Sequence, residues 1–271
     1  DTFSKIDDLP LDAYIEMKRI SEEEGIIFSS TPFNLDDIDF LSDLGMDVFK
    51  ISSSDLTYHE LISETAKTKK PIILSTGLST VKEMEEAVEV VLKQNNDQII
   101  LQHCILSYPC EDEDSNLMKM VEMQKIFKDL PVGYSDHTYG DVVPAAAVSL
   151  GARSIEKHFT LDKSLPDSPD HGFSLDPEEL KEMVIRIRRT EASLGAFHDG
   201  YYKAEEKAYK YARKSLTSLK EIPKGTIVTK EHLTAKRPGT GIYPNEINNI
   251  IGMVANCDID EDETITKEML S

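Results

Sequence analysis

The stretch from Gly133 to Asp162 reads GYSDHTYGDVVPAAAVSLGARSIEKHFTLD. It contains two short β-rich runs that each end at a histidine, with an apolar segment of helical character between them. This order predicts two parallel strands joined by a crossover helix. The carboxyl ends of neighbouring parallel strands lie about 5 Å apart at one edge of a sheet. We therefore expect His137 and His158 to share a site.

The same strand-and-helix unit repeats along the chain from Gly25 to Gly195. The β-rich runs are GIIFSSTPF, DVFKISSS, PIILSTG, QIILQHCIL, PVGYSDHT and ARSIEKHFT. The segments between them carry apolar residues at helical spacing, as in STVKEMEEAVEVVLKQN. Polar residues gather at the carboxyl ends of the runs, namely Thr31, Ser53, Ser75, Ser107, Ser135, Asp136, His137 and His158. That edge forms the active site of a (β/α)8 TIM-type barrel, so the pattern favours a barrel over an open doubly wound sheet.

The predicted barrel is short of strands. Six runs follow an initial predicted helix, LPLDAYIEMKRISEEEG, whereas a closed barrel needs eight strands. The chain also begins with Asp1 instead of Met. We therefore expect the barrel domain, residues 1–195, to be N-terminally incomplete and to lack its first two βα units in this chain.

The pattern changes after residue 195. Residues 196–214 are charged and predict a helical linker, and residues 215–271 are short β-like runs separated by turns. Within this small β-rich domain IPKGTIVTKEHL and DIDEDETITKEML are alike, which is typical of a duplicated β-clip.

Composition excludes several classes of protein. The 271 residues are 39% hydrophobic, which is enough for a sizeable core. The 30 basic and 50 acidic residues give a net charge of −20, which repels nucleic acid and anionic membranes. No long apolar run or secretory signal is seen, so we expect a cytoplasmic protein. The three cysteines lack CxxC spacing and predict reduced thiols.

The two histidines at strand ends are the first candidates for chemistry. Two neutral imidazoles form a half-shell for Mn, Fe, Co or Zn and leave positions open for substrate and water. The alternative is that each histidine is structural, but their paired placement favours the metal. Of the other histidines, His103 lies within a predicted strand and is expected in the core or directly behind the site.

Four further residues have charges in informative places. Lys50 alternates with Phe49 and Ile51, so it is expected to point into the barrel, where an anion would meet it. The loop LPDSPDHGFS places Asp167 and Asp170 near the proposed metal, as a base or as an acidic turn. In KRPGTGIYP, Arg237 is displayed on a stiff loop suited either to recognition or to a plain surface.

The ordered set of motifs resembles that of the N-acetylneuraminate (sialic acid) synthase family. The matching pieces are STPF, FKISSSDLT, PIILSTGLST, SYP, GYSDHT, EKHFTLD, PDH and KRPGTGI, and they run across essentially the whole chain. The resemblance implies a TIM barrel, a C-terminal antifreeze-like (SAF) domain, a divalent metal that is commonly Mn²⁺, and a domain-swapped homodimer. It also implies condensation of phosphoenolpyruvate with an N-acylated aminosugar, typically N-acetylmannosamine, to a nine-carbon 2-keto acid and phosphate.

The resemblance also implies roles for individual residues. It makes His137 and His158 the metal ligands. Contacts to phosphoenolpyruvate are implied for Thr31, Lys50, Ser53 and Ser135. Contacts to the sugar are implied for Asp55, Tyr108, Asp170 and Glu205. Arg237 corresponds to the arginine that the SAF domain of one subunit offers to the N-acyl group in the other subunit's barrel.

The sequence departs from the family pattern at three places. The family's first two strands have no counterpart, Leu106 stands where many members have Asn or Ser, and the Asp170 loop is one residue longer. The acceptor sugar can therefore differ from N-acetylmannosamine, and precursors of the legionaminic or pseudaminic type remain open. Two alternatives are another metal-dependent phosphoenolpyruvate-condensing synthase or aldolase, and a non-catalytic sugar-binding protein.

Overall fold

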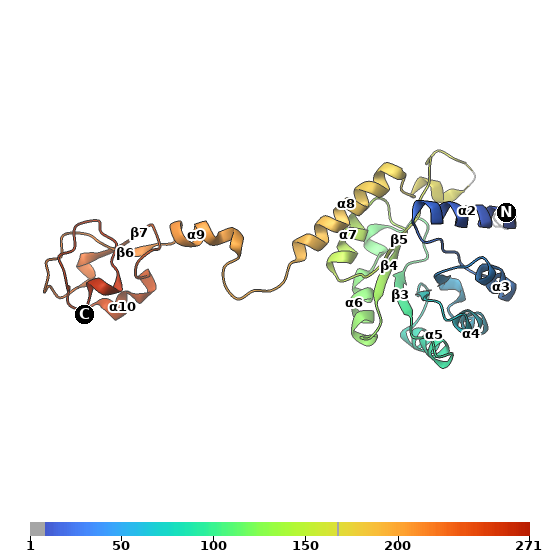
Figure 1. Cartoon of the computed structure of the whole chain (residues 1–271), viewed down its shortest axis with the longest axis horizontal. Coiled ribbons are helices and arrows are strands. Elements are labelled where there is room, and N and C mark those ends of the chain that lie inside the picture. Colours follow the sequence, from blue (N-terminus) through green and yellow to red (C-terminus); the bar gives the residue numbers. More distant parts are fainter. Residues whose placement is uncertain (1–8, 167) are drawn as a thin grey trace. The chain divides into compact units, whose positions relative to one another are not determined.

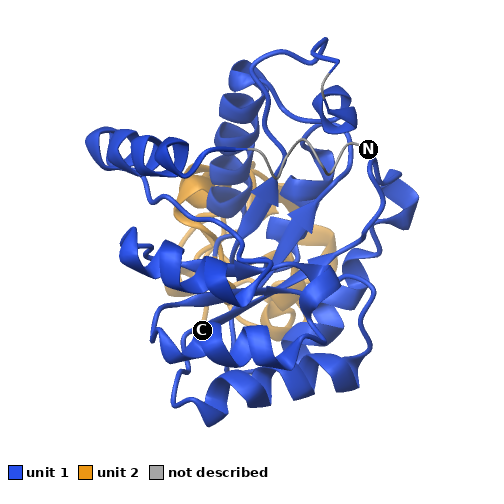
Figure 2. Ribbon diagram, turned by 90° about the vertical axis from the view of Figure 1, so that its right-hand side faces the viewer, with its two compact units in different colours: residues 1–195 blue, residues 196–271 orange. Residues whose placement is uncertain are grey.

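The computed structural model describes residues 9–166 and 168–271. The chain divides into two compact units, Asp1–Gly195 and Ala196–Ser271, which Figure 2 shows in different colours.

A parallel sheet forms the centre of the first unit. Its strands are β1 (Phe49–Ile51), β2 (Ile72–Ser75), β3 (Ile99–Cys104), β4 (Val132–Asp136) and β5 (Ile155–Lys157), hydrogen-bonded in that order. The sheet with its helices is a partial TIM-type barrel, as the sequence predicted. Sequential order and parallel pairing bring all the carboxyl ends to one edge.

The run GIIFSSTPF, the first of the six predicted strands along the chain, does not form a strand. It contributes only an isolated parallel bridge from Ser30 to Phe49. Ile26 and Ile27 are 64% and 67% exposed, so these β-branched side chains find no apolar layer to pack against. β-branched residues favour a strand mainly where their side chains pack against a partly buried surface. This surface is missing among the described residues, which explains why the predicted strand does not form.

Helices lie along the outside of the sheet (Figure 1). They are α2 (Leu11–Glu24), α3 (Leu35–Asp43), α4 (His59–Lys67), α5 (Val81–Lys93), α6 (Leu117–Ile126), α7 (Val142–Ser149) and α8 (Pro177–Leu194). Short 3-10 turns lie at Ser53–Asp55, Asp112–Asp114 and Pro169–Gly172. Local sequence marks the start of α5 and α8, since Thr80 with Glu83, and Asp176 with Glu179, form capping boxes.

Apolar side chains on the outer face of the sheet and the inner faces of the helices form one core. Ile51, Leu74, Leu101 and Tyr134 are fully buried in this core, and Phe49 is fully buried in a smaller cluster beside α3. Burial of such a side chain contributes about 1.5–3 kcal/mol. The core thus fixes the strands and leaves the alternate residues of each strand for the opposite, inner face.

The second unit is a small β-rich domain. Strands β6 (Ser215–Ser218) and β7 (Leu233–Lys236) pair antiparallel. Its helices and 3-10 turns are η4 (Lys203–Glu205), α9 (Glu206–Tyr211), η5 (Lys230–His232), η6 (Pro244–Glu246), α10 (Ile247–Ile250) and η7 (Lys267–Met269). The two similar segments do pair, through an antiparallel bridge from Ile222 to Ile259, and each leads to a 3-10 turn. Of the predicted helical linker, only residues 203–211 are helical, and residues 196–202 are not.

Within residues 9–166 and 168–271, every helix is too short or too polar to traverse a lipid bilayer.

Candidate active site

A polar cavity of about 120 Å³ lies at the carboxyl ends of the five strands. Residues that alternate along the strands or directly follow them line it. These residues are Lys50, Ser52, Ser53, Ser75, Cys104, Leu106, Tyr108, Ser135, His137, Glu156 and His158. Six residues with a site role predicted from sequence therefore line the same cavity: Lys50, Ser53, Tyr108, Ser135, His137 and His158.

Lys50 points into the cavity, as predicted. Its neighbours Phe49 and Ile51 are fully buried in the outer core, which turns Lys50 to the inner face. There Lys50 Nζ lies 3.2 Å from Glu156 Oε1, and the two side chains are 21% and 35% exposed. The cavity therefore holds a lysine whose charge is balanced by a carboxylate that an incoming anion can replace.

Hydroxyl groups form a second set of donors beside Lys50. Ser53 Oγ donates to Ser75 Oγ at 2.9 Å and accepts the N–H of Gly77 at 2.9 Å. Ser135 Oγ donates to Glu156 Oε1 at 3.2 Å. A lysine with several hydroxyls in one small cavity is suited to phosphate or carboxylate oxygens.

The two histidines lie edge to face, with ring centroids 5.1 Å apart and planes at 82°. His137 Nδ1 is 2.7 Å from the carbonyl oxygen of Ile105. Because a carbonyl can only accept, Nδ1 carries the proton and Nε2 keeps its lone pair. The backbone of His137 is held too, since its carbonyl accepts the N–H of Cys110 at 2.9 Å.

His158 is oriented in the same way by a carboxylate. Its Nδ1 lies 3.3 Å from Asp170 Oδ2, which assigns the proton to Nδ1 and leaves Nε2 as the acceptor. Burial lowers the pKa of His158, an effect that the carboxylates of Asp170 and Glu156 oppose. The lowered pKa favours the neutral ring, which is the form that binds metal ions.

These observations fit a divalent metal. Metal-binding histidines usually donate their second ring N–H to a carbonyl or carboxylate; His137 has such a hydrogen bond, and His158 has a carboxylate oxygen 3.3 Å from Nδ1. In the part of the chain that the structure describes, no group of three or more His, Cys, Asp or Glu side chains is arranged around a common point. The cavity could thus offer two imidazole nitrogens to a divalent ion, with its other positions left to water and substrate oxygens.

Aromatic rings enclose the histidines. The centroid of the Tyr108 ring lies 4.1 Å from that of His137 and 5.7 Å from that of His158. The ring centroids of Phe173 and His158 are 5.0 Å apart. Burial raises the pKa of Tyr108 to about 12, with smaller contributions from Cys104 and nearby carboxylates. Tyr108 therefore keeps its proton at neutral pH and can donate a hydrogen bond.

Other predicted residues of the first unit lie beside the cavity or away from it. Asp170 contacts His158 but does not line the cavity, and Thr31 follows the Ser30 bridge without lining it. Asp55 ends the 3-10 turn after Ser53, and burial raises the pKa of its carboxyl group. Asp167 lies outside the described residues.

Asp136 corrects the view that all polar residues at strand ends face the site. Its side chain is buried and belongs to the opposite face of β4, because alternation places Ser135 and His137 toward the cavity.

Glu205 and Arg237 belong to the second unit. Glu205 Oε2 accepts the N–H of Tyr202 at 2.9 Å, and Arg237 Nε donates to the carbonyl of Ala212 at 2.8 Å. Arg237 is thereby tied to the residue that follows α9. In addition, Gly239 N donates to the carbonyl of Lys210 at 2.9 Å, which holds the Arg237 loop against the same helix.

Sequence reasoning missed Glu156 and Cys104 as cavity residues. Glu156 lies two residues before His158, and Cys104 two before Leu106, so period-2 alternation places each on the inner face. That signal was available in the sequence, although nothing local shows that Glu156 contacts Lys50.

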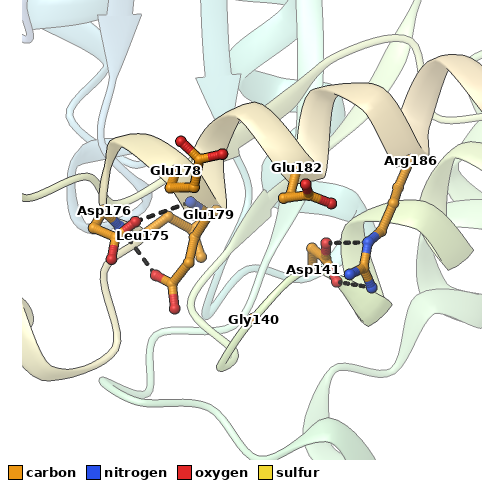
Figure 3. A pocket seen from close by; sticks show the side chains of 8 residues that line it. All are labelled: Gly140, Asp141, Leu175, Asp176, Glu178, Glu179, Glu182 and Arg186. Carbon is orange, nitrogen blue, oxygen red and sulfur yellow. Dashed lines mark hydrogen bonds and ion pairs between the residues drawn. The ribbon is translucent and has the colours of Figure 1, made fainter.

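A larger hollow of about 300 Å³ lies between α8 and the loop before α7 (Figure 3). Its lining is mainly acidic, and several of its charged groups have structural partners: Arg186 Nε lies 3.0 Å from Asp141 Oδ2, and Asp176 and Glu179 form the helix cap. An anionic substrate would be repelled here, so the cavity at the strand ends is the candidate active site.

Comparison with known proteins agrees with this geometry. The NeuB family model matches residues 1–199, and the SAF domain model matches residues 213–271. The chain is 41% identical over 260 residues to an N,N'-diacetyllegionaminic acid synthase of Campylobacter jejuni, with 95% of this chain and 77% of that protein covered. It is 36% identical over 260 residues to the N-acetylneuraminate-9-phosphate synthase of Homo sapiens, with 96% of this chain and 72% of that protein covered.

A solved structure is similar as well. The N-acetylneuraminic acid (sialic acid) synthetase of Leptospira borgpetersenii, in complex with citrate, matches with a TM-score of 0.69 and 32% identity over 74% of this chain and 69% of that one.

Proposed function

This chain belongs to the NeuB family, and from that premise we propose that it condenses phosphoenolpyruvate with an N-acylated aminosugar in the cavity at the strand ends. It is a phosphoenolpyruvate-condensing synthase of nine-carbon acidic sugars of the sialic, legionaminic or pseudaminic type. We propose N-acetylmannosamine or a related N-acylated sugar as the acceptor.

One observation supports this function most directly. A lysine, several serine hydroxyls and two histidines whose Nδ1 atoms each face an oxygen acceptor meet in one small cavity. The lysine and hydroxyls suit the phosphate and carboxylate of phosphoenolpyruvate, and the histidines suit a divalent ion.

We assign the anion side to Lys50, Ser53 and Ser135, with Thr31 completing it. Lys50 exchanges its contact with Glu156 for a substrate oxygen, and the serine hydroxyls donate to further oxygens of the same anion. These charges and dipoles hold phosphoenolpyruvate in position while charge redistributes during the reaction.

We assign the metal to His137 and His158, with Mn²⁺ as the proposed ion. When bound, a divalent ion supplies Lewis-acid polarisation of the sugar carbonyl. Ile105 and Asp170 keep the protons of the two rings on Nδ1, so that both Nε2 atoms remain acceptors.

The sugar side is assigned to Asp55, Tyr108 and Asp170 in the first unit. In the proposed reaction, C3 of phosphoenolpyruvate forms a bond to the aldehyde carbon of the open-chain sugar, water adds at C2, and phosphate leaves. Tyr108 keeps its proton and can donate to a sugar oxygen beside His137, and the carboxylates can accept from sugar hydroxyls.

From the second unit we assign Glu205 and Arg237 to the sugar. We propose a homodimer in which Arg237 of one chain reaches the N-acyl group held in the other chain's barrel. The tie between Arg237 Nε and Ala212 supports this role, because an ordered guanidinium loses less entropy on binding.

The test is phosphate release by the chain with Mn²⁺, phosphoenolpyruvate and each of three acceptors, the amino-sugar precursors of sialic, legionaminic and pseudaminic acids. We expect one acceptor to give phosphate and a nine-carbon 2-keto acid in equal amounts, seen by mass spectrometry. A fourth acceptor, a sugar phosphate without an N-acyl group, tests the alternative: phosphate release with this acceptor alone would favour another phosphoenolpyruvate-condensing synthase. The absence of phosphate release with every acceptor, together with retained sugar binding, would favour the non-catalytic alternative.

A further inference from the structure

A buried ion pair lies directly behind the two histidines of the cavity. Asp136 and Lys157 are register partners in β4 and β5, and each immediately precedes one of the histidines. Lys157 Nζ lies 2.5 Å from Asp136 Oδ2, and the two side chains are 2% and 0% exposed. Neither residue lines the cavity, so neither can touch a substrate there.

Thr138, the residue after His137, is hydrogen-bonded to both members of this ion pair. Asp136 Oδ1 accepts the backbone N–H of Thr138 at 3.0 Å and its hydroxyl at 2.9 Å. Lys157 Nζ also donates to the carbonyl of Thr138. The residues before and after His137 are therefore both bound to the residue before His158.

Stability alone does not explain this pair. Removing two charges from water costs several kcal/mol for each ion, and apolar replacement of a whole buried pair is often neutral or stabilising. What a buried pair can provide is a unique partner: Lys157 donates to the carboxylate of Asp136 at the end of β4 and to the carbonyl of Thr138 just beyond that strand.

Register matters here because β5 is a short strand at the edge of the sheet; past its end, the carbonyl of His158 accepts the N–H of Leu175 at 2.9 Å. The strand has three residues, and β4 is its only neighbour in the sheet among the described residues. A slip by one residue would turn every side chain of β5 to the other face. His158 would then leave the cavity, and His137 would be without its counterpart.

We propose that the Asp136–Lys157 ion pair sets the register of β5 against β4 and so fixes the spacing of His137 and His158. Asp136 and Lys157 are positioning residues for the two imidazoles. The inference rests on the proposed function only in taking these histidines as metal ligands.

The test is the double variant Asp136→Asn with Lys157→Met, in which the asparagine still accepts from Thr138 but the link between the strands is lost. In the full chain we expect Mn²⁺ affinity, measured by electron paramagnetic resonance of the free ion, to fall about 10- to 100-fold. Hydrogen exchange of the metal-free protein should become faster in residues 132–138 and 155–158. The variant Asp136→Asn with Lys157→Gln keeps a neutral link and should recover part of both losses.

The matched control is Asp141→Asn with Arg186→Met, which removes the ion pair between α8 and the loop before α7. Its Mn²⁺ affinity should stay within twofold of the wild type. Unchanged Mn²⁺ affinity and exchange in the Asp136 and Lys157 double variant would overturn the inference. A wild-type chain that binds no Mn²⁺ would refute the metal site of the proposed function instead, and unchanged exchange at the two strands would then overturn the register claim separately.

Discussion

Replacement of Lys50 by Met tests the anion side of the cavity. The change keeps the length and the apolar stem but removes the charge. Glu156 Oε1, now 3.2 Å from Lys50 Nζ, would be left without its cation and would face the incoming phosphoenolpyruvate. The variant therefore loses the attraction between Lys50 and the anionic substrate, and the unpaired Glu156 carboxylate repels that substrate.

The geometry gives the size of the effect. Two unit charges at about 4 Å interact by about 4 kcal/mol at an effective dielectric constant of about 20. Lys50 is partly exposed, and screening by solvent reduces this to about half. The expected loss of about 2 kcal/mol corresponds to an increase of about 30-fold in the KM for phosphoenolpyruvate.

Steady-state kinetics with each substrate varied in turn would measure this change in KM. The KM for the aminosugar should change much less than that for phosphoenolpyruvate. The double variant with Glu156→Gln should show a smaller increase than Lys50→Met alone, because the uncovered repulsion is gone. Lys82→Met, which removes a lysine exposed on α5, is the control and should change neither KM. Equal changes in the two KM values for Lys50→Met would show that Lys50 is structural and would refute the assignment.

Three other predictions concern stability and assembly. Burial raises the pKa of Asp55, so the folded protein binds its proton more tightly than the unfolded chain and loses stability as pH rises above the ordinary aspartate pKa of about 3.9. Asp55→Asn should therefore raise the Tm at pH 7 but not near pH 3, and a gain of equal size at both pH values would contradict this cause. An added Cβ at Gly133 would lie 2.5 Å from the backbone oxygen of Ser154, so Gly133→Ala should lower the free energy of unfolding by about 1–3 kcal/mol in urea denaturation, and an unchanged midpoint would be inconsistent with this contact. If subunits share sites, inactive His137→Ala and Arg237→Ala chains should regain partial activity when mixed and refolded, whereas heterodimers without activity would place each site within one chain.

The sequence determined the parts of the fold that depend on local patterns. Alternation around Lys50 predicted that its side chain would face inward, because neighbouring residues of a strand point to opposite faces. The βαβ order around His137 and His158 predicted their meeting, because neighbouring parallel strands end at the same edge.

Only the tertiary structure decided which polar groups contact one another. The contacts of Lys50 with Glu156, of His137 with the carbonyl of Ile105, and of Asp136 with Lys157 join residues far apart in sequence. By local pattern Asp136 is one more polar residue at a strand end, yet packing against the helices makes it half of a buried ion pair. Alternation tells which face of a strand a residue occupies, but its partner there depends on the register between strands and on the layer that covers that face.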